Sequence, residues 1–120
     1  MYLKHNFYRD ALAGTRHILC KESAAEYLNM SNGTIGRRVD YYAEAGGREI
    51  INKGGILCTS VNQTINDLLA DDGSDEQTLL ESLSNYYFDH DESFDGMRIE
   101  PENLCRFEEL KQAAVEYYDD

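Results

Sequence analysis

The stretch of sequence that decides the fold is Ser23-Ala-Ala-Glu-Tyr-Leu-Asn-Met-Ser-Asn-Gly-Thr-Ile-Gly-Arg-Arg-Val39. Ser23 and Glu26 form an S-x-x-E capping box, which predicts that a helix begins at Ser23. Asn29-Met30 would end this helix. The side chains that the helix is expected to bury are Ala24, Ala25 and Leu28.

A second helix is predicted to begin at Ser31, because serine is a favourable N-cap residue. Ile35, Val39 and Tyr42 recur at spacings of four and three, so they would share one buried face. Gly46-Gly47 would end this helix. Two short helices around a tight turn, the second with paired arginines, are typical of a helix-turn-helix, whose second helix usually enters the DNA major groove.

Residues 48–59 predict a β-hairpin. Two runs of β-forming residues flank Asn52-Lys-Gly-Gly55, and glycine supplies the positive φ angles that tight turns require. Ser60 and Gln63 form a second capping box and so predict a further helix. The apolar side of that helix comprises Val61, Ile65, Leu68 and Leu69.

The remaining segments predict helices and one brief strand. Residues 1–17 predict a short helix that packs an aromatic face on the following domain, and residues 18–22 predict the strand. Asp71-Asp-Gly-Ser74 is the clearest boundary, after which Ser74 and Gln77 would cap a helix that runs to about Phe88. Its packing residues are Leu79, Leu80, Leu83, Tyr86 and Tyr87.

Pro101 suits the first turn of a last helix, because the N–H that proline lacks has no helical partner there. The packing residues of this helix are Leu104, Phe107, Leu110, Ala114, Val115 and Tyr118. The last two helices could pair as an acidic hairpin. We therefore expect a mainly α chain with a small β-hairpin wing. Its parts are an N-terminal extension (1–17), a winged helix-turn-helix (18–70) and an acidic helical region (71–120).

The order of these elements is that of a winged helix-turn-helix. Residues 18–70 resemble the excisionase and mercury-resistance-regulator (MerR-like) branch of that superfamily. The segments that carry the resemblance are Ser23-Ala-Ala-Glu-Tyr-Leu28, Ser31-Asn-Gly-Thr-Ile-Gly-Arg-Arg38 and Asn52-Lys-Gly-Gly55. They are similar to the first helix, the turn with the second helix, and the wing of that family. A similar domain opens the small terminase subunits of phages.

The resemblance implies that exposed residues of the second helix and the wing contact double-stranded DNA. In this chain those residues are Ser31, Asn32, Thr34, Arg37, Arg38, Arg48 and Lys53. Arginine can pair bidentately with guanine and asparagine with adenine, while serine and threonine bind phosphate oxygens. The implied protein is of phage or mobile-element type. It would be a transcriptional regulator or a recombination or packaging accessory, and it would act as a homo-oligomer.

The charge of the chain is unevenly distributed and qualifies this expectation. The net charge is −12. Residues 1–60 hold eight Lys/Arg and six Asp/Glu, whereas residues 61–120 hold three Lys/Arg and seventeen Asp/Glu. Because non-specific DNA affinity comes from phosphate neutralisation, residues 18–70 alone should bind DNA weakly, and a dimer or a bound partner would be needed. An alternative is that the helix-turn-helix is retained as a protein-binding scaffold.

The acidic half supports a different functional class. Carboxylates spaced along helices can imitate DNA phosphates, which would make the chain an inhibitor of the anti-CRISPR or antirestriction class that binds a host nucleic-acid-handling protein. The carboxylates that would form this surface are Asp89, Asp91, Glu92, Asp95, Glu108, Glu109 and Glu116. Two other interpretations remain, a solvated acidic hairpin and an autoinhibitory region that competes for Arg37 and Arg38.

No motif indicates catalysis, so we do not expect an enzyme. Cys20, Cys58 and Cys105 are far apart and lack metal-ligand spacing, so we expect no metal and no cofactor. The sequence contains no apolar run long enough to span a bilayer and no apolar centre of a secretory signal near Met1. We therefore expect no membrane contact and a location in the cytoplasm of a bacterial host cell.

Overall fold

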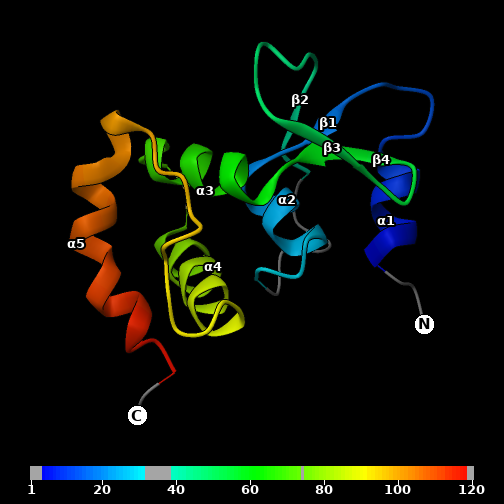
Figure 1. The fold of residues 1–120 in the computed structure, drawn as a ribbon. Coiled ribbons are helices and arrows are strands. Elements are labelled where there is room, and N and C mark those ends of the chain that lie inside the picture. The colour runs from blue at the N-terminus through cyan, green and yellow to red at the C-terminus, as the bar shows by residue number, and fades with distance from the viewer. Residues whose placement is uncertain (1–3, 32–38, 74, 119–120) are drawn as a thin grey trace.

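The computed structural model describes residues 4–31, 39–73 and 75–118. Its elements, in chain order, are α1 (Lys4–Ala11), β1 (Ile18–Leu19), α2 (Lys21–Tyr27), β2 (Tyr41–Tyr42), β3 (Ile50–Lys53), β4 (Ile56–Thr59), α3 (Val61–Ala70), α4 (Glu76–Asp89), the 3₁₀ turn η1 (Pro101–Asn103) and α5 (Leu104–Val115) (Figure 1). The described part of the chain thus combines five α-helices with a small four-stranded sheet, a mixed α/β class. None of the helices among the described residues is both long and apolar enough to cross a membrane.

The predicted hairpin is confirmed and forms one side of the sheet. β3 and β4 pair antiparallel around Gly54 and Gly55, whose φ angles of +62° and +89° are those that a two-residue turn needs. The order of the strands is β2-β1-β4-β3, with β1 parallel to β4 and antiparallel to β2. The hairpin is therefore joined to a strand that precedes α2.

The predicted second helix is wrong beyond residue 38, while residues 32–38 lie outside the described residues. Residues 39–40 have no regular structure, and Tyr41–Tyr42 form the edge strand β2 in place of a helical turn. The Cys20 N–H donates to the Asp40 carbonyl at 3.1 Å, so the free edge of β1 draws this segment into the sheet. Tyrosine favours strands, and Gly46 and Gly47 accordingly lie in a loop between strands.

The predicted capping box at the start of α2 is also wrong. The helix begins two residues earlier, at Lys21 after Cys20, and no side chain caps it. The Ser23 hydroxyl instead accepts from the Asp40 N–H at 2.8 Å, and Glu26 accepts from the Tyr8 hydroxyl at 2.6 Å. Both side chains are buried, so tertiary contacts outweigh the local cap.

The later helix starts follow the predictions more closely. The Ser60 hydroxyl accepts from the Gln63 N–H at 3.1 Å and caps α3 as predicted. The Gln63 side chain does not complete the box, because its Oε1 accepts from the Glu49 N–H at 3.0 Å. Asp75 is the N-cap of α4 and accepts from the Gln77 N–H at 3.0 Å; the predicted cap Ser74 lies outside the described residues.

Two hydrophobic cores meet at α2. The sheet core lies between α1, α2 and the sheet and comprises Tyr8, Leu12, Leu19, Ala24, Tyr27, Ile56 and Cys58. The helical core comprises Ala25, Met30, Ile65, Leu68, Leu69, Leu79, Leu83, Tyr86, Met97, Phe107 and Ala114, and so draws on α2, α3, α4 and α5. The acidic region 71–120 therefore packs on the segment before it, and removing it would expose the apolar side of α3.

The last helix buries fewer residues than its spacing predicted. Pro101 does start it, through η1, and Phe107 and Ala114 are buried as expected. Leu104 is 45% exposed and Tyr118 is 54% exposed, because α5 packs on α4 through a narrow face. Side-chain hydrogen bonds between α4 and the end of α5 join Gln77 to Tyr117 at 3.3 Å and Asn85 to Tyr118 at 2.9 Å.

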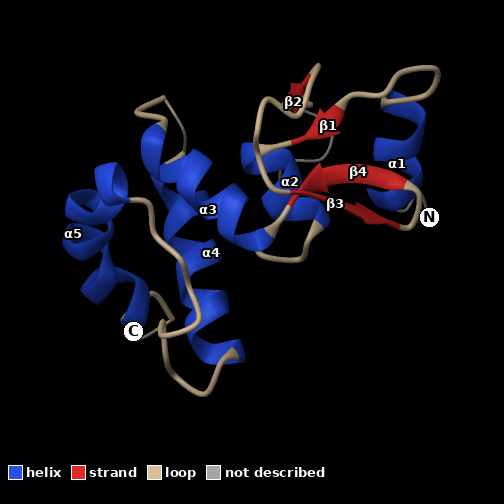
Figure 2. Ribbon diagram, turned by 45° about the horizontal axis from the view of Figure 1, so that its top comes forward, coloured by secondary structure: helices blue, strands red, loops and turns tan. Residues whose placement is uncertain are grey.

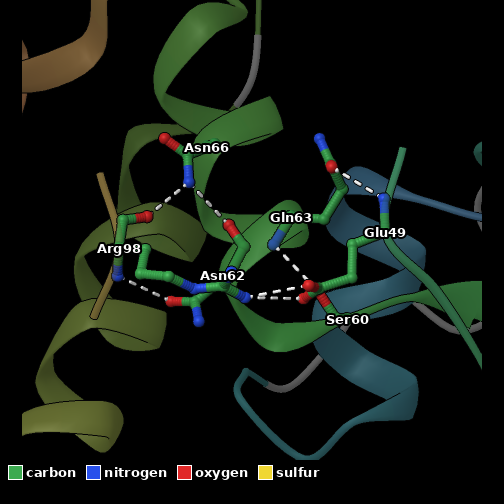
Figure 3. Close-up of polar contacts among 6 residues, drawn as sticks. All are labelled: Glu49, Ser60, Asn62, Gln63, Asn66 and Arg98. Carbon is green, nitrogen blue, oxygen red and sulfur yellow. Dashed lines mark hydrogen bonds and ion pairs between the residues drawn. The ribbon is translucent and has the colours of Figure 1, made fainter. Parts of the chain in front are cut away.

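A polar network fastens Arg98 to α3 and to Glu49, the residue before β3 (Figure 3). Arg98 forms an ion pair with Glu49 at 2.9 Å, and Glu49 also accepts from the Ser60 hydroxyl. The Asn62 side chain accepts from the Arg98 N–H at 3.0 Å. The Asn66 side chain donates to the Arg98 carbonyl at 2.8 Å. This network therefore links the acidic half of the chain to the half that carries most of the cations.

Candidate nucleic-acid interface

Cationic side chains of the N-terminal half gather at one end of the molecule. This end is formed by α1, the loop of residues 12–17 and the β3–β4 turn, and it lies opposite α4 and α5 (Figure 2). We call it the cationic end. Its basic side chains are Lys4, His5, Arg9, Arg16, His17 and Lys53.

One group of these side chains surrounds Tyr27 of α2. The Lys53 ammonium lies 5.4 Å from the centre of the Tyr27 ring, and the Tyr27 hydroxyl donates to the Lys53 carbonyl at 2.7 Å. The same hydroxyl accepts from Nδ1 of His5 at 2.9 Å. Tyr27 thus fixes the hairpin turn against α1.

Lys4 completes this group from the N-terminal turn of α1. Its ammonium donates to the Glu26 carbonyl at 2.8 Å and to the side chain of Asn29. Burial lowers the pKa of Lys4 from its ordinary value, Glu26 opposes that shift, and Lys53 adds to it.

A second group surrounds a cavity of about 290 Å³ between the end of α1, the loop and the start of β4. Among the described residues, Arg9, Arg16 and His17 are the titratable ones that line it, and no carboxylate of this part of the chain does. His17 stacks on Tyr41 of β2 with ring centres 4.1 Å apart. Because Tyr41 is 49% exposed, an aromatic surface lies beside the cationic one.

The structure places the DNA-contacting residues predicted from sequence in different settings. Lys53 lies exposed on β3, within the cationic end. Arg48 stacks over the Tyr42 ring at 3.7 Å and donates to the Ala45 carbonyl at 3.3 Å, so its side chain braces the loop before β3. Ser31 is buried, with 3% of its surface exposed. The other predicted residues, Asn32, Thr34, Arg37 and Arg38, lie outside the described residues.

Sequence reasoning does not assign Lys4, Arg9, Arg16 or His17 to the interface. The one signal that could have found them is the excess of cations in residues 1–60. The pattern of residues 1–17 predicts only an aromatic packing face, and it gives their cations no role. These residues lie near the hairpin only because α1 packs on the sheet. A local sequence pattern does not predict that packing.

The predicted acidic residues lie at the end of α4, in the loop that follows it, and on or just after α5. Asp89, Asp91, Glu92, Asp95, Glu108, Glu109 and Glu116 are all exposed, and we call them the acidic surface. Within the described part of the chain none of them forms an ion pair. Glu109 and Glu116 accept from the neutral side chains of Cys105 and Gln112.

The three cations of the acidic half are used elsewhere. Arg98 pairs with Glu49, and Arg106 donates to the Leu69 carbonyl at 2.7 Å near the end of α3. Lys111 lies 5.7 Å from the centre of the Phe107 ring. Within the described residues, no ion pair joins any of these three cations to the acidic surface.

The described residues contain no group of three or more His, Cys, Asp or Glu side chains placed to hold a metal ion. Comparisons of the chain with protein-family models, curated proteins and solved structures give no match.

Proposed function

We propose that the chain is a small DNA-binding protein of phage or mobile-element type, a regulator or a recombination or packaging accessory. It binds double-stranded DNA with its cationic end, the β3–β4 hairpin and the helix-turn-helix segment that includes Arg37 and Arg38. It acts as a homo-oligomer in the cytoplasm of a bacterial host. The cationic end supplies phosphate contacts, and the helix-turn-helix segment supplies the base contacts.

The observation that carries this proposal is the separation of charge along the molecule. The cationic end has six basic side chains around the hairpin, although the whole chain has a net charge of −12. A chain with scattered charges would repel DNA from every side, whereas this one can present its cations while the acidic surface faces away. The order strand, helix, turn, hairpin and helix also supports it.

Fluorescence anisotropy with a labelled duplex tests the assignment to residues. Arg37→Ala with Arg38→Ala should abolish binding, and Lys111→Ala with Arg98→Ala removes the same charge from the acidic half and should not. If both double variants bind as the wild type does, the helix-turn-helix segment does not contact DNA.

A second candidate function is favoured by where the carboxylates lie. Asp89 is the last residue of α4 and Glu116 follows the last residue of α5, where a negative charge opposes the helix dipole. Asp91 and Glu92 both have a φ of +57°, a conformation unfavourable for non-glycine residues. Residues that break local rules in this way are expected at functional sites.

Under this second candidate the acidic surface imitates DNA phosphates and occupies the nucleic-acid groove of a host protein. The intact chain used as bait should retain a host protein that Asp91→Asn with Glu92→Gln and Asp95→Asn releases. The Arg37→Ala, Arg38→Ala variant should still retain it. Retention by the neutralised variant would refute the role of the acidic surface.

A further inference from the structure

Within the described part of the chain, the titratable side chains that line the cavity at the cationic end are those of Arg9, Arg16 and His17. Arg9 projects from the last turn of α1, and Arg16 and His17 from the loop that follows it. The rest of the wall comes from the loop backbone and from β4, including Leu12 and Ile56.

The guanidinium groups of this cavity are poorly neutralised. The side chains of Arg9 and Asp10 lie 3.5 Å apart but are 61% and 56% exposed, so water and salt screen their attraction. Arg16 makes no ion pair within the described part of the chain. An unpaired arginine offers a planar set of N–H donors that matches the oxygens of a phosphate.

The backbone also leaves room for a ligand. Gly14 and Gly55 both line the cavity, with φ angles of +77° and +89°. Among the described residues, apart from each glycine and its chain neighbours, no heavy atom lies within 4 Å of the position that a Cβ atom would take there. A ligand can therefore approach the main chain closely at both glycines.

We infer that this cavity binds a phosphate group, held by the guanidinium groups of Arg9 and Arg16 with His17 at its rim. If the phosphate belongs to a DNA backbone that passes the hairpin, the inference rests on the proposed function. The same chemistry would accept free inorganic phosphate. The two sources are distinguished by experiment.

The first experiment titrates the full chain with inorganic phosphate at constant ionic strength and follows backbone amides by ¹H–¹⁵N NMR. The Gly14 and Gly55 amides should shift and saturate. Arg16→Ala should weaken binding about tenfold, because it removes a charged hydrogen-bond donor. Lys111→Ala removes one charge from α5 and should leave the titration unchanged. Shifts that do not saturate, or that are equal in Arg16→Ala and the wild type, overturn the inference.

The second experiment measures duplex DNA binding by Arg9→Ala with Arg16→Ala over a range of salt. A backbone phosphate in the cavity predicts about tenfold weaker binding and a salt slope reduced by about one for each arginine that no longer neutralises a phosphate. Phosphate binding with unchanged DNA affinity in this variant means that the cavity takes free phosphate and that other residues contact DNA. Phosphate binding by a wild type that binds no duplex refutes the proposed function and leaves the phosphate site standing.

Discussion

The side chain of Asn66 holds the backbone of Arg98 against α3. Its Nδ2 donates to the Arg98 carbonyl at 2.8 Å, and its Oδ1 accepts from the Glu100 N–H at 2.8 Å. Asn66 is 5% exposed, so water cannot replace these bonds readily. One buried amide thus fixes the irregular segment that connects α4 to α5.

We expect Asn66→Leu to lower the free energy of unfolding by about 3 kcal/mol, because it leaves two backbone groups without partners. Urea denaturation of both variants measures this effect. Arg98→Ala should cost much less, because the ion pair of Arg98 with Glu49 is exposed to solvent. Equal costs for the two variants would show that the ion pair holds the segment as strongly as the amide does.

The three thiols should differ in reactivity. Cys20 and Cys58 are buried and Cys105 is exposed. One thiol per chain should therefore react with a disulfide reagent at about pH 8, and all three should react in denaturant. Cys105→Ser should remove the fast reaction. Rapid reaction of that variant would mean that the sheet core opens far more easily than its packing indicates.

Alkaline pH should destabilise the chain through these buried thiols. Burial raises the pKa of Cys20 to about 12, with a further contribution from Asp40, and burial raises the pKa of Cys58 to about 11. The ordinary value for both thiols is 9.0, so the folded chain holds their protons more tightly than the unfolded chain. This stabilisation is complete below that pH and is lost as the pH rises through the folded values.

The melting temperature of the wild type should therefore fall between about pH 9 and 11. Cys58→Ala should show a smaller fall over the same range, whatever its melting temperature at neutral pH. Identical pH dependence in the two proteins would show that other groups cause the alkaline loss.

Removing the negative charge at the end of α4 should stabilise the fold. Asp89→Asn should raise the free energy of unfolding by about 0.5 kcal/mol, because the carboxylate opposes the helix dipole. Asp95→Asn removes the same charge from a loop and should change stability less. Thermal unfolding at low salt measures both. Destabilisation by Asp89→Asn would show that the Asp89 carboxylate stabilises the fold and is not unfavourable at the end of α4.

Local patterns predicted the elements that local chemistry controls. The hairpin follows from Gly54-Gly55, and the start of α3 follows from the Ser60 cap, because in both cases the decisive groups are within a few residues of each other. Strand β2 could not be predicted in this way. Val39 and Tyr42 fit a helical spacing, but the pairing of Tyr41–Tyr42 with β1 bridges more than twenty residues.

The candidate site shows the same division. Lys53 could be placed on the hairpin from sequence, because its turn is local. Arg9 and Arg16 meet β4 only through tertiary packing, and Ser23 gives up its predicted cap for a bond with Asp40, seventeen residues away. The charge distribution indicates the acidic half, but only the folded chain shows that its cations are engaged elsewhere.

Anisotropy of a labelled duplex with the full chain measures whether the cationic end binds duplex DNA. The measurement uses the full chain because residues 71–120 complete the helical core. We predict binding at about 50 mM salt that weakens steadily as salt is raised. Absence of binding at that salt concentration, where phosphate contacts are strong, would contradict the claim and leave the acidic surface as the functional face.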